Sequence, residues 1–345
     1  MKQQKIKLII AIITGCFASF IHAEAVWIDT DPACGISRTS DVDDCWALHM
    51  AIHSPDLEIH GISTVFGNSD GATTYKKAKD ITLRFNNDNT LLNIYRGADQ
   101  KLDRQNTQPT EASTALSRTL AQGKITIIAL GPVTNIATLL QLHPELSGQI
   151  SQLIAVAGKR DQHGFGFYPG DTSFLHLHDF NFRKDVEAFD VVLNSDIPII
   201  LIPYEVASKV TILPADLAQL ETSNNDAQWL ANISQHWMTF WKEDLKAKGF
   251  FPFDSLAVAY AINNESFQCK KLPVKIERHR SLFVGSRDDL VVSQDKSNGR
   301  FVHYCHNVKT DLKPLMMSTL KSRQPINIQP EEEPISNGHR DPCCK

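Results

Sequence analysis

Five aspartates lie close together near the start of the chain, at Asp29, Asp31, Asp41, Asp43 and Asp44. Carboxylates at this density cannot all stay ionised unless a cation lies among them. Their hard oxygen atoms are the ligands that Ca²⁺ and Mg²⁺ prefer. Alternatively, Asp43 and Asp44 only complement the positive end of a helix dipole, but that would leave Asp29 and Asp31 unexplained. The pattern therefore indicates a metal or acid–base site.

A strand-to-helix junction is expected to position these acids. Ala25–Ile28 is apolar throughout and predicts a short buried strand, which Pro32 ends because proline has no N–H for the ladder. Alternate strand residues point to the same face, so Asp29 and Asp31 share one face at the strand's end. Apolar residues at helical spacing over Trp46–Ala51 predict the helix that follows. Open α/β sheets bind ligands at such carboxyl ends of strands.

Strands and helices alternate along most of the remaining chain. Further strands are predicted over residues 57–65, 93–96, 125–130, 153–158 and 198–203, and further helices over residues 71–86, 135–142, 184–194, 213–221, 226–247, 254–262 and 311–320. The strands are almost continuously apolar, which indicates a sheet covered on both faces. We therefore expect an α/β fold with an open, mostly parallel sheet and helices on both faces.

Three local features refine this expectation. Residues 272–306 alternate in strand fashion, and Asn298–Gly299 within them predicts a hairpin turn, hence a small C-terminal β-hairpin region. Gly131–Pro132 ends the strand predicted over residues 125–130, and Thr134 is expected to cap the helix predicted over residues 135–142. Residues 159–178 form a long loop of the kind that is usually functional or disordered.

The N-terminal residues resemble an export signal. Lysines precede an apolar run that is short for a membrane span, and Ala23–Ala25 offers a small-x-small cleavage site. We expect a signal peptide over residues 1–25 and an exported protein, periplasmic or secreted. Ile13–Cys16 also resembles a lipoprotein box, and in that case a lipid on Cys16 would anchor the protein.

Composition suits one globular domain over residues 26–321, followed by a disordered tail. The chain has 345 residues, of which 42% are hydrophobic, enough for a full core. Residues 322–345 are polar and contain several prolines, as disordered tails do. The net charge of -4, with no basic patch among interleaved aromatics, argues against nucleic-acid binding.

Two of the seven cysteines, Cys34 and Cys45, bracket the loop between the two aspartate pairs. In an oxidising compartment they could form a disulfide, which would stabilise the fold by roughly 2–3 kcal/mol for so short a loop. Two free thiols are the alternative, because the sequence alone does not fix the pairing.

Several short motifs occur in an order typical of one enzyme family. They are Asp29-Thr30-Asp31-Pro32, Asp43-Asp44, Gly61–Asn68, Ala129–Ala137, Asp179-Phe180-Asn181-Phe182 and Phe253-Asp254. Together they resemble the motifs of the nucleoside hydrolases of the inosine–uridine-preferring type, over residues 26 to about 320. The resemblance implies a Ca²⁺-dependent N-ribohydrolase that acts on a small nucleoside and whose fold is an open α/β sheet. Family members are often dimers or tetramers, so we expect a homo-oligomer.

The resemblance also implies roles for particular residues. Asp31, Asp44, Asp254 and the backbone carbonyl of Leu130 would bind Ca²⁺, and Asp31 would take the proton from the attacking water. Asp43, Asn68, Asp179 and Asn181 would hold the ribose hydroxyls, Phe253 and Asp254 would also contact the substrate, and Asp29 would support the cluster. Breaking an N-glycosidic bond builds positive charge on the sugar, which a ring of carboxylates stabilises.

Three departures from the family pattern bear on function. The loop between Asp31 and Asp43 is longer by roughly eight residues, which adds little closure entropy. Asp179 replaces a glutamate that is one methylene longer. Phe253 replaces a histidine that protonates the leaving base in pyrimidine-tolerant members; since phenylalanine stacks but cannot donate a proton, this change favours purine nucleosides.

Other interpretations remain open from the residues alone. His163, His176 or His178 in the long loop could supply the missing proton, or have no role. A strand ending in Asp-x-Asp also begins haloacid dehalogenase-type phosphatases, although residues 125–135 lack the lysine that this mechanism needs. A third possibility is an exported binding protein for nucleosides or ribose that has lost turnover.

Overall fold

The computed structural model describes residues 23–85, 92–160, 179–281, 285–293, 295, 297 and 299–322. Residues 1–22 of the predicted signal peptide, the tail beyond Ser322, and the three histidines of the long loop lie outside the described residues. The first strand begins at Glu24. The signal peptide, its cleavage site and the tail stay predictions.

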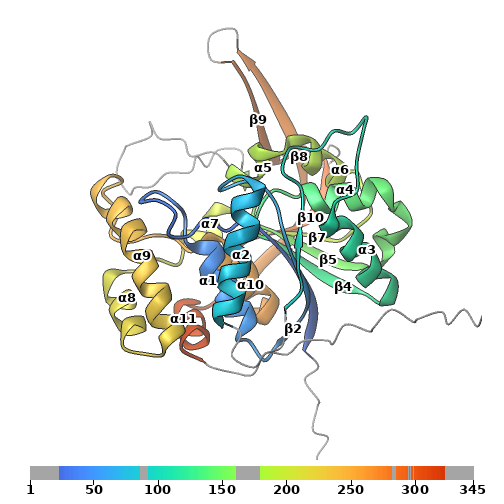
Figure 1. Cartoon of the computed structure of the whole chain (residues 1–345). Helices are drawn as coiled ribbons and strands as arrows, with labels where there is room; N and C mark the ends of the chain where they lie inside the picture. Colours follow the sequence, from blue (N-terminus) through green and yellow to red (C-terminus); the bar gives the residue numbers. More distant parts are fainter. Residues whose placement is uncertain are drawn as a thin grey trace, which may run out of the picture.

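A ten-stranded sheet forms the centre of the molecule (Figure 1). Its strands are β1 Glu24–Thr30, β2 Leu57–Thr64, β3 Ile94–Arg96, β4 Ile125–Ala129, β5 Ile150–Ala155, β6 Lys159–Arg160, β7 Ile199–Leu201, β8 Phe267–Ser281, β9 Gly285–Val292 and β10 Arg300–Val308. The spatial order is β3-β2-β1-β4-β5-β7-β10-β8-β9-β6. Among the named strands, which cover described residues alone, only the pairs of β8 with β10 and with β9 are antiparallel. The predicted open, mostly parallel sheet is confirmed.

Helices cover both faces of this sheet. They are α1 Asp43–Ile52, α2 Gly71–Phe85, α3 Glu111–Gln122, α4 Thr134–Leu142, α5 Phe180–Lys184, α6 Val186–Leu193, α7 Tyr204–Ala207, α8 Pro214–Glu221, α9 Asn225–Glu243, α10 Phe253–Ile262 and α11 Lys313–Lys321, with short 3₁₀ turns at Pro144–Gln149 and Asn264–Ser266. Figure 1 shows α8, α9 and α11 on one side of the molecule and α3, α4 and α6 on the other.

Strand β1 shows why both faces must be covered. Val26 and Ile28 belong to one hydrophobic core, with residues of α1, α9 and α10, whereas Trp27 belongs to the other, with residues of α3, α4 and α6. All three side chains are fully buried. Since successive strand residues face opposite sides, a strand with no polar residue in this run can lie only between two cores.

Neighbouring strands end together at one edge of the sheet. In the parallel ladder Asp29 of β1 lies opposite Ser63 of β2 and Ala129 of β4. The segments that follow these strands therefore meet at the same edge, and helices α1 and α10 pack beside it with acidic first turns.

Several local predictions were wrong. The hairpin connects β8 to β9, and both β9 and β10 pair with β8, so the link through Gly299 is not a hairpin turn. Thr134 lies inside α4 rather than capping it, and its hydroxyl donates to Asp185 at 2.7 Å. Helix α3 was not predicted, although Thr110 caps it by accepting from Ser113 N–H. The other predicted boundaries lie within a few residues of those observed.

Two disulfides join described cysteines. Cys34 pairs with Cys45, one of the two arrangements left open by the sequence, and Cys269 of β8 pairs with Cys305 of β10, which was not foreseen. The second bridge joins residues that face each other in the antiparallel ladder. Among the helices of the described residues, none is both long and apolar enough to cross a membrane.

The close packing of β1 on β2 yields a stability prediction. A Cβ at Gly61 would overlap the six-membered ring of Trp27, whereas a Cβ at Gly123 would meet nothing. We expect Gly61→Ala to lower the free energy of unfolding by about 1–3 kcal/mol through overpacking, and Gly123→Ala to change it by less than about 0.5 kcal/mol. Urea titration of both variants checks this, and an unchanged midpoint for Gly61→Ala would contradict it.

Candidate active site

A cavity of about 500 Å³ opens at the carboxyl edge of the sheet. Its polar lining includes Asp41, Asp43, Asn68, Asp179, Asn181 and Asp254, and its apolar lining includes Tyr204, Trp237, Phe240, Trp241 and Phe253. The cavity is large enough for a small organic ligand. Segments from distant parts of the sequence thus contribute one acidic end and one aromatic end.

Asp44, in the first turn of α1, binds back to the end of β1. Its Oδ1 accepts hydrogen bonds from the Thr30 hydroxyl at 2.5 Å and from the Asp31 backbone N–H at 3.1 Å, and its Oδ2 accepts from the Asn68 amide at 3.0 Å. These contacts hold the helix N-terminus against the strand end.

Asp31 lies where two backbone segments leave room for its carboxylate. Its Oδ2 accepts the Asn68 backbone N–H at 2.7 Å, while its Oδ1 is buried and lacks a hydrogen-bond partner among the described residues. A Cβ at Gly67 or at Gly131 would collide with this carboxylate. Glycine is therefore required at both positions for Asp31 to occupy the site. A buried carboxylate oxygen without a partner is costly, which favours a bound cation or proton there.

Three carboxylates meet beside Asp31. Oxygen atoms of Asp43, Asp44 and Asp254 all lie within 4.8 Å of one another, so the three could hold a metal ion. Asp254 enters the group because α10 begins at Phe253 beside the first turn of α1, where the Asp254 N–H donates to Asp43 Oδ2 at an N···O distance of 3.4 Å. Asp43 thus lies in the acidic cluster and also lines the cavity, and its predicted contact with the ribose stays a prediction.

The remaining predicted site residues lie around this cluster. The Leu130 carbonyl oxygen, which was predicted to bind the metal, accepts a hydrogen bond from the Asn181 amide at 2.6 Å. Leu130 lines the cavity. Asp179 accepts backbone N–H groups of Gly158 at 2.6 Å and Phe182 at 3.1 Å, and thereby caps the short helix α5. Its predicted contact with ribose stays a prediction, as do the individual metal ligands.

Asp29 lies beneath the site rather than in it. Its Oδ1 accepts from the Ser63 hydroxyl and from the Asn135 amide, the latter at 2.7 Å. Asn135 also donates to the Thr64 carbonyl and accepts from Ala98 N–H, so one side chain joins three segments. Ser63 and Asn135 lie within motifs recognised in the sequence, but only their contacts show that they support Asp29.

Burial and mutual repulsion disfavour the charged forms of the acids. The pKa values of Asp31, Asp43 and Asp254 are raised well above 3.8, first by burial and then by the neighbouring carboxylates. Burial also raises the pKa of Asp29 to about 7 and that of Asp179 to about 6. The cluster therefore takes up protons at neutral pH unless a cation supplies compensating charge.

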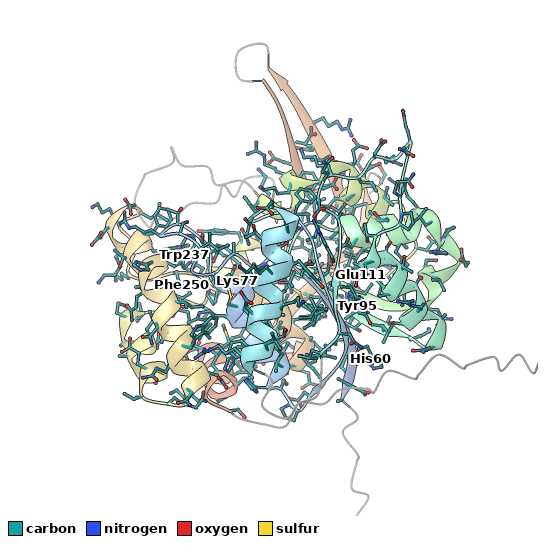
Figure 2. All side chains as sticks on the ribbon, in the orientation of Figure 1. His60, Lys77, Tyr95, Glu111, Trp237 and Phe250 are labelled. Carbon is teal, nitrogen blue, oxygen red and sulfur yellow. A yellow bond between two sulfur atoms is a disulfide. The ribbon has the colours of Figure 1, made fainter. Side chains whose placement is uncertain are left out.

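Aromatic side chains form the other end of the cavity. Trp237 and Phe240 of α9 stack with their ring centroids 5.2 Å apart. The ring centroids of Phe253 and Tyr204 are 6.1 Å apart. Figure 2 shows Trp237 on the α9 side of the molecule, away from Tyr95 of β3. The sequence predicted a helix over residues 226–247, which α9 confirms, but nothing in the sequence marked Tyr204 as part of the site.

The fold and site define an α/β enzyme with a buried acidic centre that could bind a metal ion next to a cavity with an aromatic end. The chain belongs to the inosine-uridine preferring nucleoside hydrolase family, whose model matches residues 26–312. Its enzyme class is therefore that of the N-ribohydrolases, as the motifs predicted. The phosphatase interpretation has no support from this match.

Curated relatives cover most of the domain. The chain is 27% identical to the probable uridine nucleosidase 2 of Arabidopsis thaliana, over 68% of this chain and 76% of the relative. It is 26% identical to the pyrimidine-specific ribonucleoside hydrolase RihA of Photobacterium profundum, over 70% and 84%. It is also 26% identical to the non-specific ribonucleoside hydrolase RihC of Escherichia coli, over 73% and 83%.

Solved structures share the fold. A plant nucleoside hydrolase superposes with a TM-score of 0.71 at 20% identity, covering 88% of this chain and 99% of that one. A purine-preferring ribonucleoside hydrolase from Gardnerella vaginalis superposes with a TM-score of 0.69 at 17% identity, covering 87% and 98%.

The raised pKa values predict a pH-dependent response to divalent cations. A carboxyl group whose pKa is raised by folding makes its full contribution to the stability of the metal-free protein below its pKa in the unfolded chain, 3.8. This contribution is lost as the pH rises through the pKa of the group in the folded protein, which is about 7 for Asp29. A divalent cation needs the ionised forms. We expect saturating Ca²⁺ to raise Tm by about 5–10 °C at pH 8 and by less than half as much at pH 5.

Scanning calorimetry with a chelator and with added cation checks this prediction. Asp44→Asn should remove most of the response at pH 8, because it takes one charge from the cluster. An equal rise in Tm at both pH values would show that the cation binds elsewhere.

Proposed function

We propose that this protein hydrolyses the N-glycosidic bond of ribonucleosides, preferring purine nucleosides, with Ca²⁺ as its cofactor. The observation that carries the proposal is the meeting of Asp43, Asp44 and Asp254 at the acidic end of a cavity whose other end is aromatic. A nucleoside has the matching division, since its sugar carries hydroxyl groups and its base is a planar ring system.

The sugar fits the acidic end. Asp43, Asn68, Asn181 and Asp254 line the cavity there and offer carboxylate and amide groups to ribose hydroxyls. Positive charge develops on the sugar as the bond to the base breaks. Fixed carboxylates stabilise this charge more in the transition state than in the ground state, which is what accelerates the reaction.

The donor atoms of the cluster suit Ca²⁺, because they are oxygens and include the unpartnered Oδ1 of Asp31. Asp31, Asp44, Asp254 and the Leu130 carbonyl would hold the ion, with Asp43 close by. When bound, Ca²⁺ supplies positive charge that keeps the acids ionised and makes a water molecule more acidic. Ionised Asp31 then acts as the general base that receives the proton of the attacking water.

The leaving base meets the aromatic end. Phe253 lies at the start of α10, 6.1 Å from the Tyr204 ring and 6.5 Å from the Trp241 ring. Aromatic rings at these separations form a surface on which a base can stack. Because Phe253 has no proton to donate, we favour purines, whose ring nitrogens accept a proton themselves once the base is stacked. Relatives named as pyrimidine-specific and as purine-preferring share this fold, so the preference rests on the residues of this chain.

Export to an oxidising compartment is part of this proposal. The apolar N-terminal run supports it, and so do the bridges Cys34–Cys45 and Cys269–Cys305, since disulfides persist outside the reducing cytosol. The lipid on Cys16 and the homo-oligomer stay predictions.

The function is tested by measuring release of reducing sugar from a panel of purine and pyrimidine nucleosides, with and without a chelator. Ribose release that stops on chelation and returns with Ca²⁺ supports the proposal. Cation-dependent nucleoside binding without any ribose release would instead identify a binding protein.

Removing the proposed base should abolish turnover. We expect Asp31→Ala to lower kcat by at least about 10³-fold, because it removes both a proton acceptor and a negative charge next to the sugar. Circular dichroism should show that the variant is folded. A separate titration should show that it binds Ca²⁺ more weakly than the wild type. The control is Asp196→Ala, whose carboxylate is fully exposed and should not matter. Turnover that survives in Asp31→Ala would remove Asp31 from the mechanism.

Restoring a proton donor at position 253 should change the preference for the base. We expect Phe253→His to raise kcat/KM for uridine relative to inosine by about tenfold or more, within the range of general acid catalysis. The ratio of the two kcat/KM values is the measurement, since it cancels changes in enzyme concentration. A ratio equal to that of the wild type would contradict the assigned role of Phe253.

A further inference from the structure

The long loop between the two aspartate pairs reaches the cavity. Residues 33–41, called the tethered loop below, contribute Ser37, Thr39, Ser40 and Asp41 to the cavity lining. The same cavity is lined by Trp237 and Trp241 of α9. The loop therefore adds hydroxyl groups to a cavity that also carries aromatic rings.

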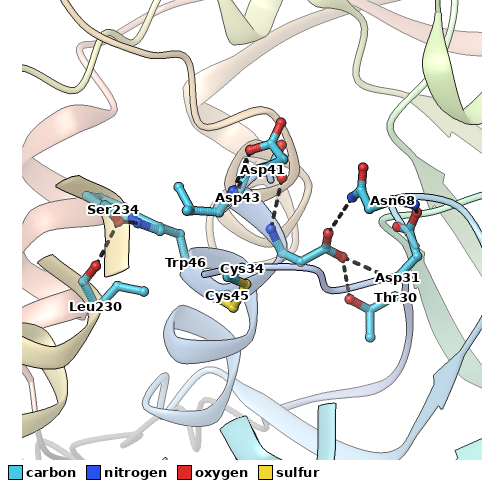
Figure 3. The surroundings of a disulfide bond; sticks show 12 residues. Thr30, Asp31, Cys34, Asp41, Asp43, Cys45, Trp46, Asn68, Leu230 and Ser234 are labelled. Carbon is cyan, nitrogen blue, oxygen red and sulfur yellow. Dashed lines mark hydrogen bonds between the residues drawn. A yellow bond between two sulfur atoms is a disulfide. The ribbon is translucent and has the colours of Figure 1, made fainter. Parts of the chain in front are cut away.

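Contacts at both ends and in the middle fix this loop. Cys34 is joined to Cys45 in α1, and Asp41 Oδ1 accepts the N–H groups of Val42 and Asp43 at 2.6 and 3.1 Å. In the middle, Arg38 pairs with Glu243 and Asp244 at the C-terminus of α9, at 3.1 and 2.6 Å. Figure 3 shows the disulfide beside Asp41 and Asp43.

These attachments differ in strength. Arg38 and both of its acidic partners are about half exposed or more, so water and salt weaken their attraction. The hydroxyls of Ser37 and Ser40, 2.9 Å apart, bond within the loop and do not anchor it to a helix. The covalent bridge is therefore the attachment least sensitive to solvent, and it lies one residue from Trp46, whose indole donates to Ser234 of α9 at 2.9 Å.

We propose that the tethered loop is a specificity-determining wall of the nucleobase subsite, and that the Cys34–Cys45 bridge holds its hydroxyls within reach of the polar edge of the base. This rests on the proposed function. A base stacked on the aromatic wall presents its ring nitrogens and exocyclic groups at its edge. Serine and threonine hydroxyls can both donate and accept, so they suit those groups. The ribose is held by other residues, at the acidic end.

The test compares two disulfide variants of the full-length protein. Cys34→Ser/Cys45→Ser should raise KM for inosine by about tenfold while kcat stays within about threefold, as expected when binding to the base is lost equally in the ground and transition states. Inhibition by free ribose should keep its Ki within twofold, because the residues proposed to hold the ribose lie outside the loop. The matched control, Cys269→Ser/Cys305→Ser, removes a bridge in the sheet and should leave KM unchanged.

Two further measurements apply if the first variant folds poorly. In the Cys269→Ser/Cys305→Ser protein, a mild reductant opens the Cys34–Cys45 bridge, and KM for inosine should rise reversibly. Thr39→Val keeps the shape and the bridge but removes a hydroxyl, and should lower kcat/KM for inosine by roughly three- to tenfold, the range of one hydrogen bond.

The outcomes separate the two proposals. If no nucleoside releases ribose with the wild-type protein, the proposed function fails. If the wild type is active but the loss of the Cys34–Cys45 bridge leaves KM unchanged, the loop is not part of the base subsite. A Ki for ribose that rises together with KM would also overturn the inference, since it would assign the bridge to the whole site.

Discussion

Burial of mutually repelling carboxylates at the end of one strand is the constraint on which the structure depends. Asp31 directly follows β1, Asp44 and Asp254 lie in the first turns of α1 and α10, and each is almost completely withdrawn from water. In the absence of compensating charge, such groups hold protons rather than charge. The surrounding fold must therefore be stable enough to keep these acids together and arranged to admit positive charge.

The backbone around the cluster is shaped to meet this demand. Gly67 and Gly131, from the segments after β2 and β4, leave the volume that the Asp31 carboxylate occupies. Asn68 donates to both Asp31 and Asp44, and Asn135 ties Asp29 to the neighbouring segments below. Donors are thus supplied from amide groups, which satisfy carboxylates without adding a positive charge that would compete with a cation.

The two ends of the cavity are built differently. The acidic end rests on strand ends and helix N-termini, whose positions follow from the sheet. The end with Trp237 and Phe240 rests on α9, and the tethered loop lines the same cavity. Surface loops tolerate changes of sequence better than the elements that they connect. Similar proteins are named for different bases. This agrees with a division in which the sheet positions the catalytic groups, and the helix and loop around the cavity set the preference for the base.

By itself the sequence determined the class of fold and the edge at which the acids lie. Continuous apolar strands such as β1 and β4 can be satisfied only between two layers of helices, and Asp29 and Asp31 at a strand end follow from the two-residue period. Family motifs located Asp44, Asn68 and Asp254. Only the tertiary structure decided that Tyr204 lines the cavity, that Cys269 faces Cys305, and that β10 pairs with β8. Those outcomes depend on long-range packing, since contacts between residues far apart in the chain are set by how helices and strands pack together and leave no local periodicity to read.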